Sequence, residues 1–210
     1  MKKIVFLISI LLVFSLAGCY SASGTAPTEK LEPDFSPLFF NSIADLKSEK
    51  DARNAPSYQG DDPQNLKDLK ACYQFSDISD DIKLSRYSMR ESYIAVSYIY
   101  QNSDDAYMSK FSGLGLSKDE LQTITLTAHR DMGQSELNEF VSRNSKSVET
   151  VALGNIAQVY CFKAMYSGSL MATDYYFMFM DQYFCLEVPG NLPNERASDL
   201  IKSIIKISLS

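Results

Sequence analysis

The chain has little of several residue types that specialised folds and sites require. Its 210 residues include no tryptophan, one histidine, seven prolines and nine glycines. These low counts exclude a collagen-like chain, and the composition as a whole also excludes a coiled coil and wholesale disorder. The 45% hydrophobic and 22% charged residues are typical of a globular protein. We therefore expect one domain, with two small domains as the alternative.

Basic residues are also scarce. Twenty Lys and Arg residues stand against 26 Asp and Glu residues, which gives a net charge of −6 and a pI near 4.9, and no Lys/Arg-rich run occurs. Sequence-independent nucleic-acid binding depends on clustered cations that displace counterions, so we expect no nucleic-acid partner. An acidic body is also repelled by anionic lipid headgroups, so membrane attachment has to come from another feature.

The N-terminus supplies such a feature. Met1-Lys2-Lys3 is basic, and the apolar run from Ile4 to Leu16 is shorter than the roughly 20 residues of a membrane-spanning helix. The sequence Leu16-Ala17-Gly18-Cys19 that follows resembles the lipobox of bacterial lipoprotein precursors. The resemblance implies that residues 1–18 are a signal peptide. It also implies that Cys19 carries a diacylglyceryl group and becomes the first residue of the mature chain.

The same resemblance predicts a location. Two or more acyl chains, such as palmitate, hold a protein stably on a membrane. We therefore expect a lipid-anchored protein of the cell envelope, on the extracytoplasmic face of a bacterial cell membrane. An ordinary secretory signal with an incidental cysteine is the alternative. Without residues 1–18 the chain has 18 basic and 26 acidic residues, a net charge of −8.

The segment after the lipobox predicts a tether. Residues 20–37 are rich in Ser, Pro, Thr, Gly and Ala and show no apolar periodicity. We interpret residues 19–37 as the lipidated cysteine and a flexible tether, with an ordered arm as the alternative. Residues 38–210 then form a single extracytoplasmic domain.

Three cysteines remain besides Cys19, namely Cys72, Cys161 and Cys185. An odd number of thiols cannot all pair within one chain. No C-x-x-C occurs, and the single histidine is far in sequence from each cysteine, so neither a zinc site nor a thioredoxin-like motif is supported. We expect no metal and no cofactor.

The second half of the body predicts an antiparallel β-meander. Four segments rich in Val, Tyr, Phe and Met are joined by short turns, and these segments are Ser147–Leu153, Ile156–Tyr166, Leu170–Met180 and Tyr183–Pro189. Gly154, the first residue of the Gly154-Asn155 turn, suits the first central position of a type II′ turn. The other two predicted turns are Ser167-Gly168-Ser169 and Asp181-Gln182.

Short turns specify register, so the two faces of this meander follow from the sequence. We expect Cys161 opposite Tyr175, and Tyr175 opposite Val188. One face is then a core face, with Val159, Cys161, Met165, Tyr175, Phe177, Phe179, Phe184, Leu186 and Val188. The second face is amphipathic, with Gln158, Tyr160, Phe162, Tyr166, Asp174, Tyr176, Met178, Tyr183, Cys185 and Glu187. Cys161 and Cys185 point to opposite faces, which excludes a disulfide between them.

A C-terminal helix is predicted next. Apolar residues recur with helical spacing from about Leu192 to Ile207, at Ala197, Leu200, Ile201, Ile204 and Ile205. We expect this helix to lie across the core face. In the first half of the body the hydrophobic patterns are weaker. They predict a helix over Ser42–Arg53 capped by Asn41, a hairpin of Ile82–Arg90 with Tyr93–Gln101, a strand over Leu121–Arg130, and a helix from a Ser135 cap to about Asn144. We predict loops over residues 54–65 and 102–118.

Strands that precede helices, rather than alternate with them, indicate an α+β fold with an antiparallel sheet. Both halves show this strands-then-helix order, but residue identity between them is too low to claim an internal duplication. The layout loosely resembles small α+β lipoprotein domains of the PsbP type, which end in a strand, a turn and a helix packed on the sheet. No diagnostic motif accompanies this resemblance, so it assigns no site residue.

Motifs for catalysis are absent: the sequence has no G-x-S-x-G, no H-E-x-x-H and no P-loop. The only histidine, His129, falls on the threonine-bearing side of a predicted strand, and we interpret it as solvated or hydrogen-bonded. Acidic pairs such as Asp61-Asp62 lack EF-hand spacing. Two carboxylates suffice for glycoside hydrolysis, but nothing in the sequence selects a pair. We therefore name no catalytic residue and no metal ligand.

Aromatic residues are the most suggestive feature, with 13 Tyr and 12 Phe. Tyrosine offers a rigid ring with a hydrogen-bonding tip, which is typical of contact surfaces. The candidate binding face consists of Tyr160, Phe162, Tyr166, Tyr176 and Tyr183. The alternative is a sheet that is buried on both sides.

The sequence thus predicts a membrane-anchored binding or accessory lipoprotein without catalytic activity. Its partner would be an unidentified protein, peptide or glycan. The alternatives are a small membrane-tethered hydrolase and a structural component of an envelope or transport assembly.

Overall fold

The computed structural model describes residues 37–57, 64–102, 104–145 and 147–210. The predicted signal peptide, the lipobox with Cys19, and the tether up to residue 36 lie outside the described residues. None of the helices in those four ranges has both the length and the apolar character that crossing a bilayer requires.

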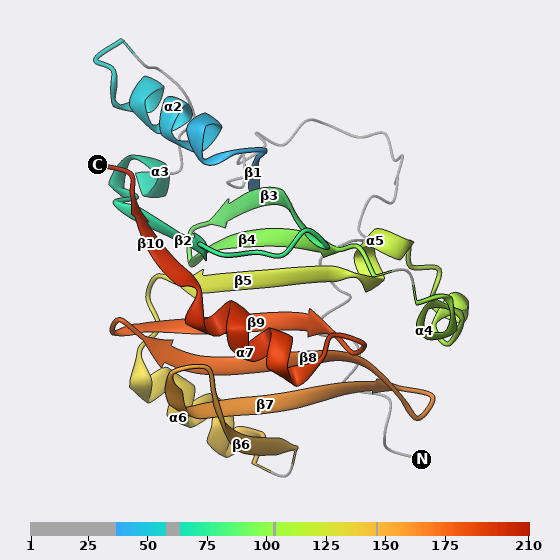
Figure 1. The fold of residues 1–210 in the computed structure, drawn as a ribbon. Helices are drawn as coiled ribbons and strands as arrows, with labels where there is room; N and C mark the ends of the chain where they lie inside the picture. The colour runs from blue at the N-terminus through green and yellow to red at the C-terminus, as the bar shows by residue number, and fades with distance from the viewer. Residues whose placement is uncertain (1–36, 58–63, 103, 146) are drawn as a thin grey trace, which may run out of the picture. The chain divides into compact units, whose positions relative to one another are not determined.

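The fold is α+β and is built on one antiparallel sheet of eight strands (Figure 1). In spatial order the strands are β1 (Leu38–Phe40), β3 (Ile82–Arg90), β4 (Tyr93–Tyr100), β5 (Thr123–His129), β9 (Gln182–Pro189), β8 (Ser169–Phe179), β7 (Ile156–Tyr166) and β6 (Val148–Leu153). Because β5 pairs with β9, the two halves of the chain form one continuous sheet. The predicted meander of β6 to β9 and the predicted β3–β4 hairpin are both confirmed.

The register of the meander is partly as predicted. Cys161 lies opposite Tyr175, as expected. Tyr175, however, lies opposite Leu186 and not Val188, because the β8–β9 turn is Met180-Asp181 and not Asp181-Gln182. The difference is two residues, and a shift of two leaves every side chain on its own face. The predicted faces therefore survive an error in the predicted turn.

The predicted core face is buried along most of its length. Val159, Phe177, Phe184 and Leu186 expose none of their surface. Met165 is the exception, since it is 50% exposed, and its assignment to the core is wrong. It lies two residues before the Ser167-Gly168 turn, beyond a register shift between Ala164 and Met165.

The chain after the meander differs from its prediction. Helix α7 covers only Asn194–Lys202, and Ile204–Ser208 form strand β10, which pairs antiparallel with β2 (Ala71–Phe75). The prediction of a helix to Ile207 is therefore wrong beyond Lys202. Within β10 the side chain of Ile204 is buried, whereas Ile205 is 38% exposed. β-Branched residues suit a strand, and pairing with β2 supplies the backbone hydrogen bonds that a longer helix would have made.

Helix α7 approaches the meander closely at one turn. Ala197, Leu200 and Ile201 belong to the same buried cluster as the core face. The Gly154 N–H donates to Ser198 Oγ at 3.0 Å, and a Cβ on Gly154 would lie 2.8 Å from Ile201 Cγ2. Gly154 has φ 65°, and Asn155 has no positive φ, which fits the predicted type II′ turn.

Helices in the first half begin at other residues than predicted. Helix α2 (Ile43–Asn54) is capped by Ser42, whose Oγ accepts from Asp45 N at 3.1 Å, so the Asn41 cap is wrong. Helix α6 (Gln134–Arg143) starts after Gly133, whose N–H donates to Glu136 at 2.9 Å, so Ser135 is not the cap.

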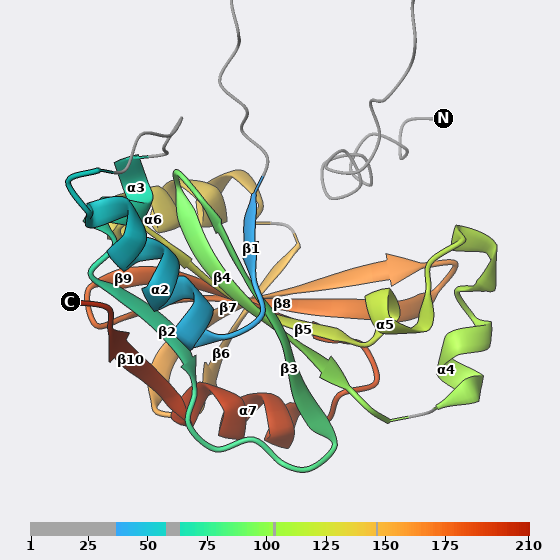
Figure 2. The same ribbon diagram turned by 90° about the horizontal axis from the view of Figure 1, so that it is seen from above.

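Short elements were missed where loops were predicted. Residues 102–118 contain α4 (Asp105–Ser109), η1 (Ser112–Leu114) and the first residue of α5 (Lys118–Leu121), and α3 (Gln64–Asp68) begins in the other predicted loop. Helices of three to five residues are too short to show an apolar period, and side-chain caps at Asp104 and Ser117 hold two of them. Figure 2 shows β2, β10 and α7 on one side of the sheet and α6 on the other.

Candidate functional site

The predicted aromatic face lies partly under α6. Tyr160 and Tyr183 are 8% and 2% exposed and form a buried cluster with Leu137 of α6. The ring of Phe140, also from α6, lies 5.2 Å from Phe162 and 4.8 Å from Tyr176, measured between centroids. The structure therefore brings four of the five predicted residues together, and two of the four are packed core.

The fifth predicted residue, Tyr166, lies apart from the others. It packs on a separate small cluster from α4 and α5 that contains Tyr107, Phe111 and Leu121, and its ring centroid is 6.3 Å from that of Phe111. The second face of the sheet is thus covered by α6 at one end and by the α4–α5 segment at the other.

A polar row crosses the sheet between these two covers. The pairings of β4, β5, β9 and β8 place Ser97, Thr125, Glu187 and Asp174 side by side, in that order. Directly opposed side chains on neighbouring strands have Cβ atoms about 4.5–5.5 Å apart, so the two carboxylates are close neighbours. Asp174 is partly buried and Glu187 is exposed. Within the described ranges, neither carboxylate has an ion pair or a side-chain hydrogen bond.

The environment of this row favours protonated carboxyl groups. Burial raises the pKa of Asp174 to about 7, and the neighbouring charge of Glu187 adds to the increase. Glu187 keeps exposed surface, but the chain packed around its carboxyl group removes water from that group, and this raises its pKa as well. Both directions follow from lost hydration without a compensating cation. Asp174 can therefore hold a proton near neutral pH, beside a carboxylate that accepts one.

The only histidine is packed between aromatic rings. The His129 ring lies 4.6 Å from the Tyr183 ring and 6.3 Å from the Tyr93 ring, measured between centroids. Burial lowers its pKa, which favours the neutral imidazole. Its ring has no hydrogen bond to any residue that the structure describes. This arrangement gives His129 a packing role and offers no nucleophile for it to activate.

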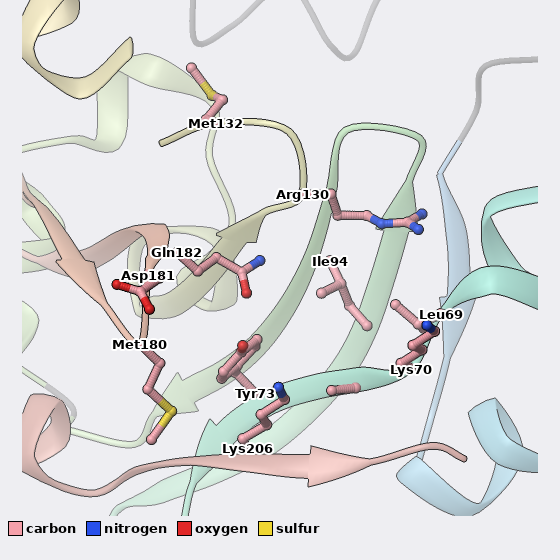
Figure 3. A pocket seen from close by; sticks show the side chains of 11 residues that line it. Leu69, Lys70, Tyr73, Ile94, Arg130, Met132, Met180, Asp181, Gln182 and Lys206 are labelled. Carbon is pink, nitrogen blue, oxygen red and sulfur yellow. The ribbon is translucent and has the colours of Figure 1, made fainter. Parts of the chain in front are cut away.

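A pocket of about 310 Å³ opens at one end of the sheet (Figure 3). Residues from β2, β4, β10, the segment after β5 and the β8–β9 turn line it, including Lys70, Tyr73, Ile94, Arg130, Asp181 and Lys206. No sequence signal predicted this pocket, because β10 and its pairing with β2 were not predicted.

A second pocket of about 170 Å³ lies between α7 and the chain ahead of β3. Its central cation is already paired, since Arg196 binds Asp81 Oδ1 at 2.6 Å and also Ser79. It therefore offers a ligand little charge.

Metal binding has no support among the residues that the structure describes, where no three His, Cys, Asp or Glu side chains converge as metal ligands would. The sequence predicts that Asp174 and Glu187 share the second face of the sheet. It does not predict that they lie directly opposite each other, because that depends on the observed β8–β9 register.

Comparison with known proteins finds no matching family model, no matching curated protein and no matching solved structure.

Proposed function

We propose that this chain is a lipoprotein, anchored through acyl chains on Cys19 to the extracytoplasmic face of a bacterial cell membrane, and that it binds a partner without transforming it. The lipobox-like sequence Leu16-Ala17-Gly18-Cys19 and the basic and apolar segments ahead of it support the anchor. Because the chain is acidic, electrostatic attraction to anionic lipids would not hold it on a membrane, so in this proposal the acyl chains alone supply the attachment.

The binding role rests on the carboxylate pair. Asp174 and Glu187 lie opposite each other without a cation from the described chain, next to the rings of Phe162 and Tyr176. A cationic group from outside would relieve the repulsion between the carboxylates, and the neighbouring rings can add cation–π attraction. The proposed partner is therefore a protein or peptide that presents Lys or Arg side chains.

The position of α7 completes this proposal. In this proposal its apolar residues Ala197, Leu200 and Ile201, which share a buried cluster with the core-face residues, cover the core face of the meander. The second face, between α6 and the α4–α5 segment, then remains for the partner.

The anchor is tested by substituting Cys19. In the native host, the Cys19→Ala chain should incorporate no palmitate analogue and should leave the membrane fraction, whereas Cys72→Ala, the matched control, should label like the wild type. Equal labelling of the Cys19→Ala and wild-type chains would contradict the lipoprotein proposal.

The partner class is tested with a lysine decapeptide and full-length protein in detergent. Calorimetry should show binding that weakens at least tenfold in the double variant Asp174→Asn/Glu187→Gln. The control double variant Asp105→Asn/Glu91→Gln removes the same charge from exposed sites and should bind like the wild type. An equal loss in both double variants would mean that only net charge matters, and the proposed face would be wrong.

One observation favours a second function, a membrane-tethered hydrolase. A carboxyl group with its pKa raised to about 7, beside a second carboxylate, is the arrangement from which glycoside hydrolases build an acid and its partner. This alternative predicts turnover of aryl glycosides that Asp174→Asn abolishes. A panel of such substrates without turnover would remove it.

The remaining alternative is a structural role in an envelope or transport assembly. It predicts stoichiometric co-purification of other envelope proteins from solubilised native membranes.

A further inference from the structure

The strands at the β1 edge of the sheet carry only positive charge. β3 contains Lys83, Arg86 and Arg90 and no acid, and its neighbours β1 and β4 contain no charged residue. The four strands of the other half, β6 to β9, contain three acids and a single lysine. Figure 1 shows β1 and β3 at one end of the sheet and β7 and β6 at the other. In a chain with a net charge of −6, the β1 edge is therefore a locally positive region.

The strand register places two of these cations on one face with an aromatic ring. Lys83 and Arg86 lie opposite residues of β4 that are two positions apart, so both side chains point to the same side, with their backbones about 7 Å apart. Phe39 of β1 lies opposite Ser88, which is two residues from Arg86 on β3. Arg86 itself is next to Ser97, the first residue of the polar row, so all of these side chains belong to the second face.

The ring and both cations are open to solvent. Phe39 is 53% exposed, and Lys83 and Arg86 are exposed as well. The guanidinium carbon of Arg86 lies 4.7 Å from the centroid of the Phe39 ring. This contact leaves the charge of Arg86 uncompensated, because the ring carries no net charge. Neither Lys83 nor Arg86 forms an ion pair or a side-chain hydrogen bond within the described ranges. We call Phe39, Lys83 and Arg86 the positive edge.

The positive edge lies where the predicted tether joins the domain. Residues 20–37, 18 in number, separate Cys19 from the first residue of β1, and a fully extended chain of that length spans at most about 65 Å. A domain that is anchored through Cys19 is connected to the bilayer at β1. Chain length thus limits the distance from the bilayer more tightly at the positive edge than at any later part of the domain.

From these observations we infer that the positive edge docks on the surface of the anchoring membrane, with the Phe39 ring among the headgroups and Lys83 and Arg86 against anionic lipids. An aromatic ring with a neighbouring cation suits the boundary between water and lipid. This inference rests on the proposed anchor at Cys19. The acyl chains supply the attachment, and the positive edge orients the domain, because the acidic remainder is repelled by the same lipids. The carboxylate pair, on β8 and β9, then stays accessible to a partner.

Docking is tested with an introduced tryptophan. The chain contains none, so a single tryptophan reports only its own surroundings. The acylated Phe39→Trp chain is purified from native host membranes and reconstituted into vesicles of equal parts brominated phosphatidylcholine and phosphatidylglycerol. Its emission should shift to shorter wavelengths and be quenched by the bromine. Met165→Trp, at a position on β7 that is 50% exposed, is the control and should remain unquenched.

The recognition of charge is tested in the Phe39→Trp chain. Each cation near an anionic surface favours binding by about a factor of five, so Lys83→Gln/Arg86→Gln should lower the ratio of docked to free domain by roughly 25-fold. Vesicles of phosphatidylcholine alone should give a similar loss. The control Lys110→Gln/Lys118→Gln removes two exposed lysines of the α4–α5 segment and should leave the ratio unchanged.

Palmitate labelling of the same samples separates this inference from the proposed anchor. A labelled chain whose introduced tryptophan at position 39 is not quenched overturns the inference and leaves the anchor in place. Equal quenching of the Met165→Trp chain overturns it too, and so does an equal loss in the two double variants. A chain without label overturns the proposed anchor and, with it, this inference.

Discussion

Among single residues, Tyr160 is the one whose substitution distinguishes an exposed binding surface from a packed core face. Tyr160 is 8% exposed and packs beside Leu137, and its hydroxyl accepts from Gln158 Nε2 at 2.5 Å. Tyr160→Ser should therefore lower the free energy of unfolding by about 2–4 kcal/mol, through a cavity and a lost hydrogen bond. Urea denaturation measures it, with Thr150→Ser, an exposed residue opposite Tyr160 on β6, as the control. A change below about 0.5 kcal/mol would instead mark Tyr160 as a surface residue.

Asp174 makes stability depend on pH. Its pKa rises from 3.8 to about 7 on folding, so the native state binds a proton more tightly than the unfolded state. The free energy of unfolding should therefore fall as pH rises from about 4 to about 7, and should be level above that range. Asp174→Asn should reduce this fall to the part that Glu187 causes, and it should stabilise the protein at pH 8 by about 4 kcal/mol, because each tenfold change in proton affinity corresponds to about 1.4 kcal/mol.

The measurement is a series of urea transitions between pH 4 and 8. Asp51→Asn, an exposed residue of α2, is the control and should keep the wild-type pH profile. A variant at position 174 that also keeps the wild-type profile would show that Asp174 is ionised without penalty.

At the scale of elements, the β8–β9 turn determines a register. Met180 and Asp181 occupy positive φ in a two-residue turn, for which Asn-Gly is the favoured sequence. Met180→Asn/Asp181→Gly should stabilise the protein by about 1 kcal/mol, because the new residues adopt this conformation with less strain. Met165→Asn controls for the loss of an exposed methionine. A lower urea midpoint in the turn variant would show that the native side chains contribute more than the turn geometry does.

The end of α7 shows why element boundaries are hard to predict. Ile204 and Ile205 fit the helical spacing of Ala197, Leu200 and Ile201, so the local pattern extends the helix. The same residues are β-branched and suit a strand. A partner strand, β2, decides between the two, and β2 lies about 130 residues earlier in the chain.

For the whole molecule, the reactivity of the cysteines can show whether distant segments unfold together, because these segments share one core. Cys72 in β2 and Cys161 in β7 belong to one buried cluster, and Cys185 in β9 faces the other side of the sheet. All three are free thiols, and burial raises the pKa of Cys72 to about 12, which keeps it protonated and unreactive.

The three thiols should therefore react with iodoacetamide only on global unfolding, with one common urea midpoint. Mass spectrometry of each labelled peptide measures this. A lower midpoint for Cys72 would show that the β2–β10 pair unfolds separately from the main sheet. A Cys161–Cys185 disulfide in a non-reducing peptide map would contradict the observed faces.

Local sequence patterns were enough to predict the strands of the meander and the faces of their side chains. Alternation with a period of two and turns of two residues act between near neighbours, and a two-residue error in the β8–β9 register left the assignment of Asp174 and Glu187 unchanged. The lipobox is likewise local, and its consequence, the anchor at Cys19, stays a prediction.

Which parts of these faces are covered, and which distant residues come into contact, depends instead on how the whole chain packs. Helix α6 buries Tyr160 and Tyr183 but leaves Glu187 exposed. The residue pattern within β7 or β9 does not indicate where a helix will pack on the sheet. The pocket joins Lys70 to Lys206 only because β2 pairs with β10. Such pairings depend on the packing of the whole chain. The free energy of a contact between distant residues has to offset the entropy lost when a long loop closes. A short stretch of sequence shows neither the contact nor the length of the loop.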